Sequence, residues 1–145
     1  MGSLRTVVFV CQHGAAKSIL AAALLERLAI EHGLPIRALA RGTELEPQVA
    51  VAVVAGLLAK GVDVRAWQPR QVTRDDLARA WRVISFGPEL AHLLPHGALV
   101  ERWNDVPAVA EGVEAAASAI AERLRELVKD ITNSGGAITR PRPSG

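Results

Sequence analysis

The chain has 145 residues, a mass of 15.4 kDa and a net charge of +2 from 17 basic and 15 acidic side chains. This length allows one well-buried domain and is short for two. The small, scattered charge argues against a nucleic-acid partner, and the absence of an apolar run of ~20 residues argues against a membrane partner. The single cysteine cannot form an internal disulfide, and the first residues lack the order of a secretory signal. Both features predict a cytoplasmic protein.

The first half of the chain alternates between strand and helix patterns. Residues 4–10 are apolar and β-branched, as in a strand covered on both faces. Residues 17–32 repeat apolar side chains at spacings of three and four, which predicts a helix. Residues 35–40 predict a second strand, and residues 47–60 a second helix that begins at a proline and ends before a glycine.

The second half continues the alternation. Thr73 is the expected N-cap of a short helix with two aspartates in its first turn, where the helix dipole favours acidic side chains. Strands are predicted at residues 81–86 and 98–103, followed by a long amphipathic helix at 110–131. Residues 132–145 are rich in Gly, Ser, Pro and Arg and are predicted to form a disordered tail.

This alternation predicts an α/β fold for a single domain, residues 1–131. The expected architecture is a three-layer sandwich in which helices cover both faces of a four-stranded parallel sheet. Ligands of such sheets bind outside the carboxyl ends of the strands, where the first strand meets its helix. The segment CQHGAAKS, residues 11–18, occupies this place. Its backbone N–H groups and the helix N-terminus after it suit an anion such as phosphate.

Two kinds of phosphate chemistry use such a loop. A nucleotide-binding Walker loop would place Lys17 and Ser18 correctly, but Cys11 and Ala16 stand where its two glycines are required. The other kind uses the thiol, because a helix N-terminus and a nearby cation favour the thiolate form of Cys11. A thiolate can attack an oxyanion bound in the same loop. The alternative interpretation of Cys11 is a small buried core residue at a strand end.

The order Cys, five residues, cation, Ser resembles the loop of the low-molecular-weight protein tyrosine phosphatases and of the arsenate reductases that share their fold. The His-x-Ala portion and the following AAALLERLA look more like the arsenate reductase branch. The segments ARGTE (40–44), QPRQVTRDDLARAWRVISFG (68–87) and ERWNDVPA (101–108) are similar to further segments of the family. Together these similarities span most of residues 5–128 in family order.

The resemblance implies roles for the residues of this loop. Cys11 would be the nucleophile that forms a cysteinyl-phosphate intermediate, and Ser18 would hydrogen-bond its thiolate. The remaining loop residues would bind the oxyanion: Gln12, His13, Gly14, Ala15 and Ala16. Gly14 stands where the family has an asparagine with left-handed backbone, a conformation that glycine adopts without strain.

Two residues depart from the family pattern. Lys17 stands in place of an arginine, and an ammonium is a point charge where a guanidinium grips two oxygens in one plane. Arg41, in the neighbouring loop, is a candidate substitute for that guanidinium. Asp105 is the implied general acid that protonates the leaving group. However, Val106 separates it from the proline that directly follows the aspartate in the family.

The sequence therefore leaves three functions open. The first is a metal-independent phosphatase, with phosphate esters or a phosphoprotein as substrate. The second is an arsenate reductase, which would need an external thiol or redoxin because the chain has one cysteine. The third is a degenerate member that binds an oxyanion or a partner without turnover. The phosphatase is placed first. No metal or other cofactor is expected, because the histidines are dispersed without metal-ligand spacing.

Overall fold

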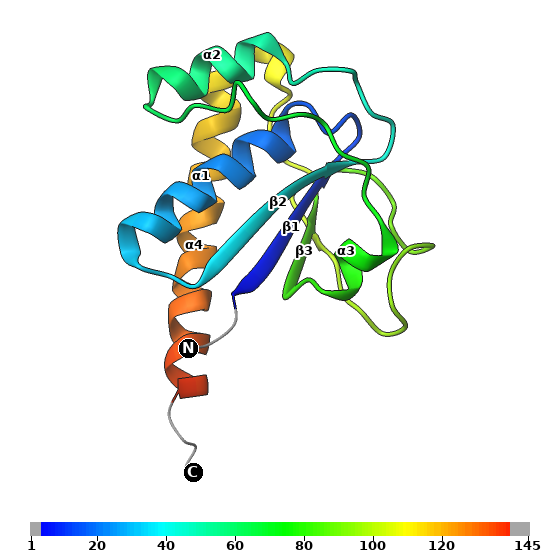
Figure 1. Cartoon of the computed structure of the whole chain (residues 1–145), viewed down its shortest axis with the longest axis vertical. Helices are drawn as coiled ribbons and strands as arrows, with labels where there is room; N and C mark the ends of the chain where they lie inside the picture. The colour runs from blue at the N-terminus through cyan, green and yellow to red at the C-terminus, as the bar shows by residue number, and fades with distance from the viewer. Residues whose placement is uncertain (1–3, 140–145) are drawn as a thin grey trace.

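The strands form one parallel sheet, as predicted. The computed structural model describes residues 4–139, with side chains as far as residue 133. The strands are β1 (Arg5–Cys11), β2 (Ile36–Gly42), β3 (Arg82–Ser85) and β4 (Glu101–Arg102). They pair in the order β2-β1-β3-β4, every pair parallel. The carboxyl ends of all four strands therefore meet at one edge of the sheet (Figure 1).

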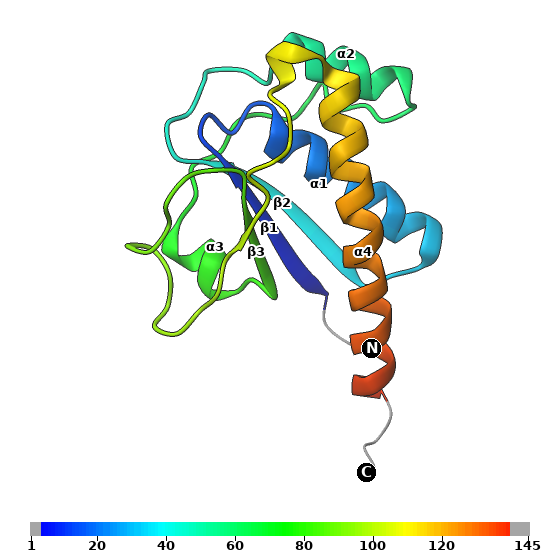
Figure 2. The ribbon, with the colours of Figure 1, turned by 180° about the vertical axis from the view of Figure 1, so that it is seen from behind.

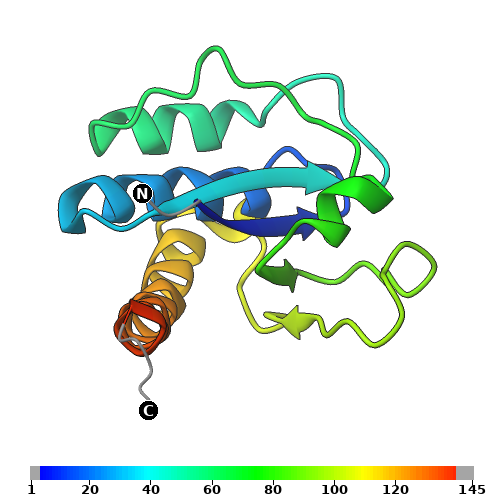
Figure 3. The ribbon, with the colours of Figure 1, turned by 60° about the horizontal axis from the view of Figure 1, so that its bottom comes forward.

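Helices cover both faces of this sheet. They are α1 (Lys17–His32), α2 (Val51–Ala59), α3 (Arg74–Ala78), the 3-10 turn η1 (Val109–Glu111) and α4 (Val113–Thr139). Helices α1 and α4 pack on one face, with α2 resting on both of them, while α3 lies on the opposite face (Figures 2 and 3). The predicted three-layer α/β architecture is confirmed. No helix among residues 4–139 is both long and apolar enough to cross a membrane.

Several boundaries differ from the sequence-based expectation, and three of the differences concern α2, β4 and α4. Helix α2 begins at Val51 rather than at residue 47, because Ala50 has a non-helical ψ of 133° and its N–H donates to the carbonyl of Ala15 at 2.9 Å. Strand β4 has two residues rather than six. Helix α4 continues to Thr139, so residues 132–139 are helical where a disordered tail is predicted. The rest of that predicted tail, residues 140–145, lies outside the described residues.

An aromatic cluster anchors the site end of the core. The rings of Phe9 and Phe86 lie 6.3 Å apart, and each lies 5.8 Å from the ring of Trp103. Phe9 belongs to β1, Phe86 follows β3 and Trp103 follows β4, so the cluster joins three strands at the edge where they end. Trp103 is 1% exposed. It is therefore a core residue and does not line the mouth of the site.

A partly buried ion pair fixes α3 against β2. Thr73 caps the helix as predicted: its side chain accepts from Asp76 N–H at 3.0 Å, and the Asp76 carboxylate accepts from Thr73 N–H at 3.0 Å. The same carboxylate accepts from Arg41 Nε at 2.9 Å, and the two side chains are only 16% and 15% exposed. The capping box thus also holds the carboxyl end of β2.

Replacing Asp76 tests this connection. Asp76→Ala removes the side-chain half of the capping box, the bond from Thr73 N–H, and leaves the Arg41 guanidinium partly buried without its partner, so we expect a loss of about 2–3 kcal/mol in the free energy of unfolding. Asp75 is the matched control, because it lies in the same helical turn but forms an exposed ion pair with Arg79. Asp75→Ala should cost less than about 1 kcal/mol. Urea unfolding measures both values, and equal losses would contradict the interpretation.

Candidate active site

The thiol lies at the bottom of the loop that joins β1 to α1. We call residues 11–18 the oxyanion loop. Cys11 ends β1 and is 7% exposed, and Ser18 lies fully buried in the first turn of α1. Cys11 Sγ and Ser18 Oγ are 3.0 Å apart. A hydroxyl at this distance can donate a hydrogen bond to a thiolate, so the structure brings together two residues that the sequence singles out.

A second loop, residues 42–50, turns the carbonyl groups of the oxyanion loop outward. We call it the supporting loop. Its backbone N–H groups donate four hydrogen bonds: Thr43 and Glu44 to Gln12 at 2.9 and 2.7 Å, Glu46 to His13 at 3.1 Å, and Ala50 to Ala15 at 2.9 Å. A trans peptide carries its C=O and the next N–H on opposite sides. The N–H groups of residues 13, 14 and 16 therefore point away from the supporting loop.

These N–H groups have no partner in the described part of the chain. None of the backbone N–H groups from Gln12 to Ser18 donates a hydrogen bond to any residue in the range 4–139. Those of Lys17 and Ser18 also belong to the first turn of α1, whose N-terminus carries a partial positive charge. The oxyanion loop therefore offers a set of backbone donors without partners among the described residues, beside a thiol, which suits a tetrahedral oxyanion.

Two glycines allow the loops to approach closely. Gly14 has a φ of 63°, the left-handed conformation expected for it. A Cβ atom on Gly42 would lie 2.5 Å from Gly14 N and 2.7 Å from its Cα, so a side chain there would collide with backbone. The supporting loop thus contacts the oxyanion loop through main chain alone at this point.

The first two side chains of the loop face the supporting loop. Gln12 Nε2 donates to Glu44 Oε1 at 2.8 Å, and His13 Nδ1 lies 2.9 Å from the Glu44 carbonyl oxygen. Both are exposed. They contribute backbone N–H groups rather than side chains to the unpartnered donors of the oxyanion loop.

Lys17 reaches across to the segment that follows β4. We call residues 103–108 the acid segment. Lys17 Nζ donates to the carbonyl oxygen of Val106 at 2.9 Å. An ammonium has three donors, so this contact leaves two for a bound oxyanion. The cation of the oxyanion loop is thus hydrogen-bonded to the residue that interrupts the expected Asp-Pro sequence.

Arg41 and Asp105 are not brought to the loop. Arg41 lies on the face of β2 opposite to Ala40, which packs with the core under α1, because side chains alternate along a strand. Its guanidinium is bonded to Asp76 on the α3 side. Asp105 is 71% exposed, and its carboxylate accepts from Arg123 Nη2 on α4 at 2.6 Å.

The contacts that hold Lys17, Asp105 and the oxyanion loop in place have almost no signal in the sequence. Val106 and Arg123 carry no motif, and their partners Lys17 and Asp105 lie 89 and 18 residues away. The supporting loop bonds through its backbone, which any residue type provides. Gly42 carries a weak signal, because it is a glycine two residues after the predicted strand at residues 35–40.

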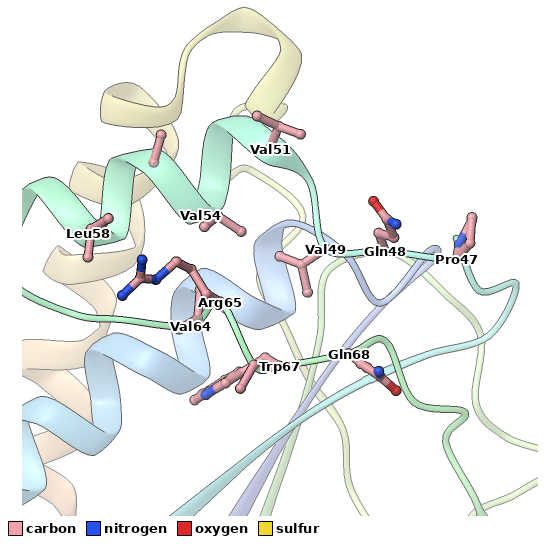
Figure 4. A pocket seen from close by; sticks show the side chains of 12 residues that line it. Pro47, Gln48, Val49, Val51, Val54, Leu58, Val64, Arg65, Trp67 and Gln68 are labelled. Carbon is pink, nitrogen blue, oxygen red and sulfur yellow. The ribbon is translucent and has the colours of Figure 1, made fainter.

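Two hollows flank the loops. One, of about 530 Å³, lies beside Gln12 and is polar, with Glu44, Glu89 and His92 in its wall. The other, of about 700 Å³, lies between α2 and residues 64–68 and is mostly apolar (Figure 4). No three or more His, Cys, Asp or Glu side chains gather as a metal site within the described range.

Comparisons with known proteins agree with this architecture. Residues 6–102 match the family model of the low molecular weight phosphotyrosine protein phosphatases. A comparison with curated proteins finds no match. Among solved structures, YfkJ from Bacillus subtilis is similar with a TM-score of 0.79 and 22% identity over 92% of this chain and 98% of that one.

Two further structures belong to different enzymes. A thioredoxin-dependent arsenate reductase from Corynebacterium glutamicum has a TM-score of 0.75 and 24% identity over 92% of this chain and 64% of that one. A protein tyrosine phosphatase from Entamoeba histolytica has a TM-score of 0.75 and 16% identity, covering 89% and 96%. The chain carries the fold and the cysteine loop of this class. It belongs to the low molecular weight phosphotyrosine protein phosphatase family, whose structural neighbours include arsenate reductases.

The close approach of the two loops can be tested at Gly42. In Gly42→Ala the new methyl group meets backbone atoms of residues 13 and 14, so we expect destabilisation of about 1–3 kcal/mol and weaker phosphate binding. Gly56→Ala is the control for a collision away from the site, because its methyl group would lie 2.7 Å from Val113 Cγ1, a side-chain atom, so phosphate affinity should stay unchanged. Urea unfolding and phosphate titration calorimetry measure the two effects. Unchanged phosphate affinity in Gly42→Ala would contradict the role of this contact.

Proposed function

We propose that the chain is a metal-independent phosphatase that acts through a cysteinyl-phosphate intermediate. The observation that carries this proposal is the 3.0 Å contact between Cys11 Sγ and Ser18 Oγ beneath backbone N–H groups that have no partner among the described residues. A buried thiol without a chemical role would need neither feature. Membership of the phosphatase family supports the same conclusion.

The proposed reaction has two steps. The Cys11 thiolate attacks phosphorus, the bond from phosphorus to the ester oxygen breaks, and the leaving oxygen departs with the electron pair. Water then attacks the cysteinyl-phosphate, the P–S bond breaks, and phosphate and the thiolate are released. The loop N–H groups and Lys17 stabilise the charge on the phosphoryl oxygens, as in other electrostatically catalysed phosphoryl transfers. Ser18 stabilises the thiolate when it forms and when it leaves.

The family resemblance makes Asp105 only the candidate donor of a proton to the leaving group. In the structure this carboxylate is bonded to Arg123. To act as the acid, Asp105 would have to part from Arg123 and approach the oxyanion loop. An ion pair this exposed contributes about 1 kcal/mol or less, so the pair alone does not prevent that movement.

Arsenate reduction is the second candidate, favoured by the similarity to the Corynebacterium glutamicum arsenate reductase. Cys11 would replace one oxygen of arsenate, releasing water. An external thiol would then attack the Cys11 sulfur, forming a mixed disulfide and releasing arsenite, so that As(V) is reduced to As(III). This chain has one cysteine, so both the attacking thiol and the later reductant must come from outside.

Turnover of a small aryl phosphate in the presence of EDTA tests the proposal. We expect saturable release of phosphate between pH 5 and 8 that disappears in Cys11→Ser. Arsenite release that requires both arsenate and an added thiol, without phosphatase activity, would favour the reductase instead. Phosphate binding in calorimetry with neither activity would identify a binding protein.

Ser18 provides a second prediction. Ser18→Ala removes a hydrogen bond to the charged thiolate, which is worth about 1.5–3 kcal/mol, so we expect kcat to fall by about one to two orders of magnitude. Ser118→Ala is the control, because Ser118 is an exposed serine on α4. Steady-state kinetics at fixed pH measures both. An unchanged kcat in Ser18→Ala would mean that the contact with Cys11 has no catalytic role.

A further inference from the structure

The two departures from the family pattern contact each other. Lys17 replaces an arginine, and Val106 is the residue inserted between Asp105 and Pro107. These positions are 89 residues apart, yet Lys17 Nζ donates to the Val106 carbonyl at 2.9 Å. A lysine ends in a single nitrogen that can bond one carbonyl and still present two donors to an oxyanion. The shorter cation and the longer segment therefore fit together.

The acid segment is also fixed on both sides of Asp105. Trp103 is 1% exposed and lies in the aromatic cluster. Its backbone N–H donates to the Ser85 carbonyl at 2.9 Å. Val106 is 4% exposed. Between these two buried residues, Asn104 and Asp105 are exposed, and the Asp105 carboxylate pairs with Arg123, whose guanidinium carbon lies 5.5 Å above the Trp103 ring. The bond from Lys17 and the burial of Val106 therefore oppose a displacement of the backbone that follows Asp105.

We propose that Lys17, besides its donors to the oxyanion, is a positioning residue that holds the acid segment through Val106. The enzyme therefore acts on phosphates whose leaving group departs without a proton, above all on acyl phosphates. This inference rests on the proposed phosphatase function. It names the substrate class that the geometry of the acid segment selects.

The chemistry of the leaving group explains the selection. The first step releases a carboxylate from an acyl phosphate, and carboxylic acids have pKa values of about 4, so this anion is stable at neutral pH. A tyrosine phenol has a pKa of about 10, and an alcohol holds its proton more tightly still. These leaving groups need an acid in the transition state. In the second step, water supplies the oxygen and its proton passes to solvent, so neither step requires Asp105.

Asp105→Asn tests the inference without disturbing the loop. The substrates are acetyl phosphate, p-nitrophenyl phosphate, phenyl phosphate and glycerol phosphate, in order of rising leaving-group pKa. We expect kcat/KM to fall steeply along this series in the wild-type protein and Asp105→Asn to change each value by less than about threefold. A working general acid contributes about 10²–10⁴-fold. A loss of tenfold or more on phenyl phosphate in Asp105→Asn would overturn the proposal.

Two controls separate the possible failures. Asp130→Asn alters another exposed aspartate, which pairs with Arg82, and should leave every rate unchanged. Cys11→Ser is the blank for each substrate. Turnover of no substrate above this blank would overturn the phosphatase function itself, and the inference with it. Cys11-dependent turnover with a large Asp105→Asn defect would overturn the inference alone.

The positioning role of Lys17 has its own signature. Lys17→Met removes the bond to Val106 and also a donor to the oxyanion, so kcat/KM should fall for every substrate. The fall of kcat/KM with rising leaving-group pKa should nevertheless become shallower in Lys17→Met, because Asp105 is released. It should become steep again in the double variant Lys17→Met/Asp105→Asn. A simple loss of oxyanion binding would lower all rates and leave the slope unchanged, which would contradict the positioning role.

Discussion

The site depends on the hydrogen bonds that turn the oxyanion-loop carbonyls outward. Because C=O and the next N–H point in opposite directions across a trans peptide, four bonds from the supporting loop also determine where the N–H groups point. Gly42 and Gly14 make this possible, since any Cβ on Gly42 would keep the loops apart. The groups expected to bind an anion are therefore backbone N–H groups. It requires a neighbouring loop at the right distance more than any particular side chain on the oxyanion loop.

The distance between the oxyanion loop and the supporting loop depends in turn on where strands β1 and β2 end. Register places Cys11 opposite Gly42, so the thiol and the start of the supporting loop leave the sheet side by side. The Arg41–Asp76 pair ties the end of β2 to α3, and the aromatic cluster ties β1 to the segments after β3 and β4. Packing on both faces of the sheet thus fixes the positions from which the three loops of the site begin.

The sequence predicts the elements of the site better than its long-range contacts. Helix α1 has the predicted bounds, because periodic apolar residues and Gly33 are local signals. The pairing of Cys11 with Ser18 is similarly local, within one strand-loop-helix unit. The sequence suggests Arg41 as a second cation for the oxyanion. Strand alternation instead places its side chain on the α3 face, and this becomes evident only once the register of β2 is known. The partners of Lys17 and Asp105 depend on tertiary packing, so no local pattern could have identified them.

The two sequence departures have a different meaning once they are seen together. Taken singly, lysine for arginine weakens the grip on an oxyanion, and an inserted residue displaces an acid, so each predicts a damaged enzyme. In the structure the ammonium donates to the carbonyl of the inserted residue, and Trp103 and Val106 anchor the segment in the core. Random decay at two separate sites would not produce a mutual hydrogen bond and a packed segment. For the proposed phosphatase reaction, this arrangement supplies the thiol, the N–H groups and a cation for attack on phosphorus, while the candidate acid, Asp105, is paired with Arg123.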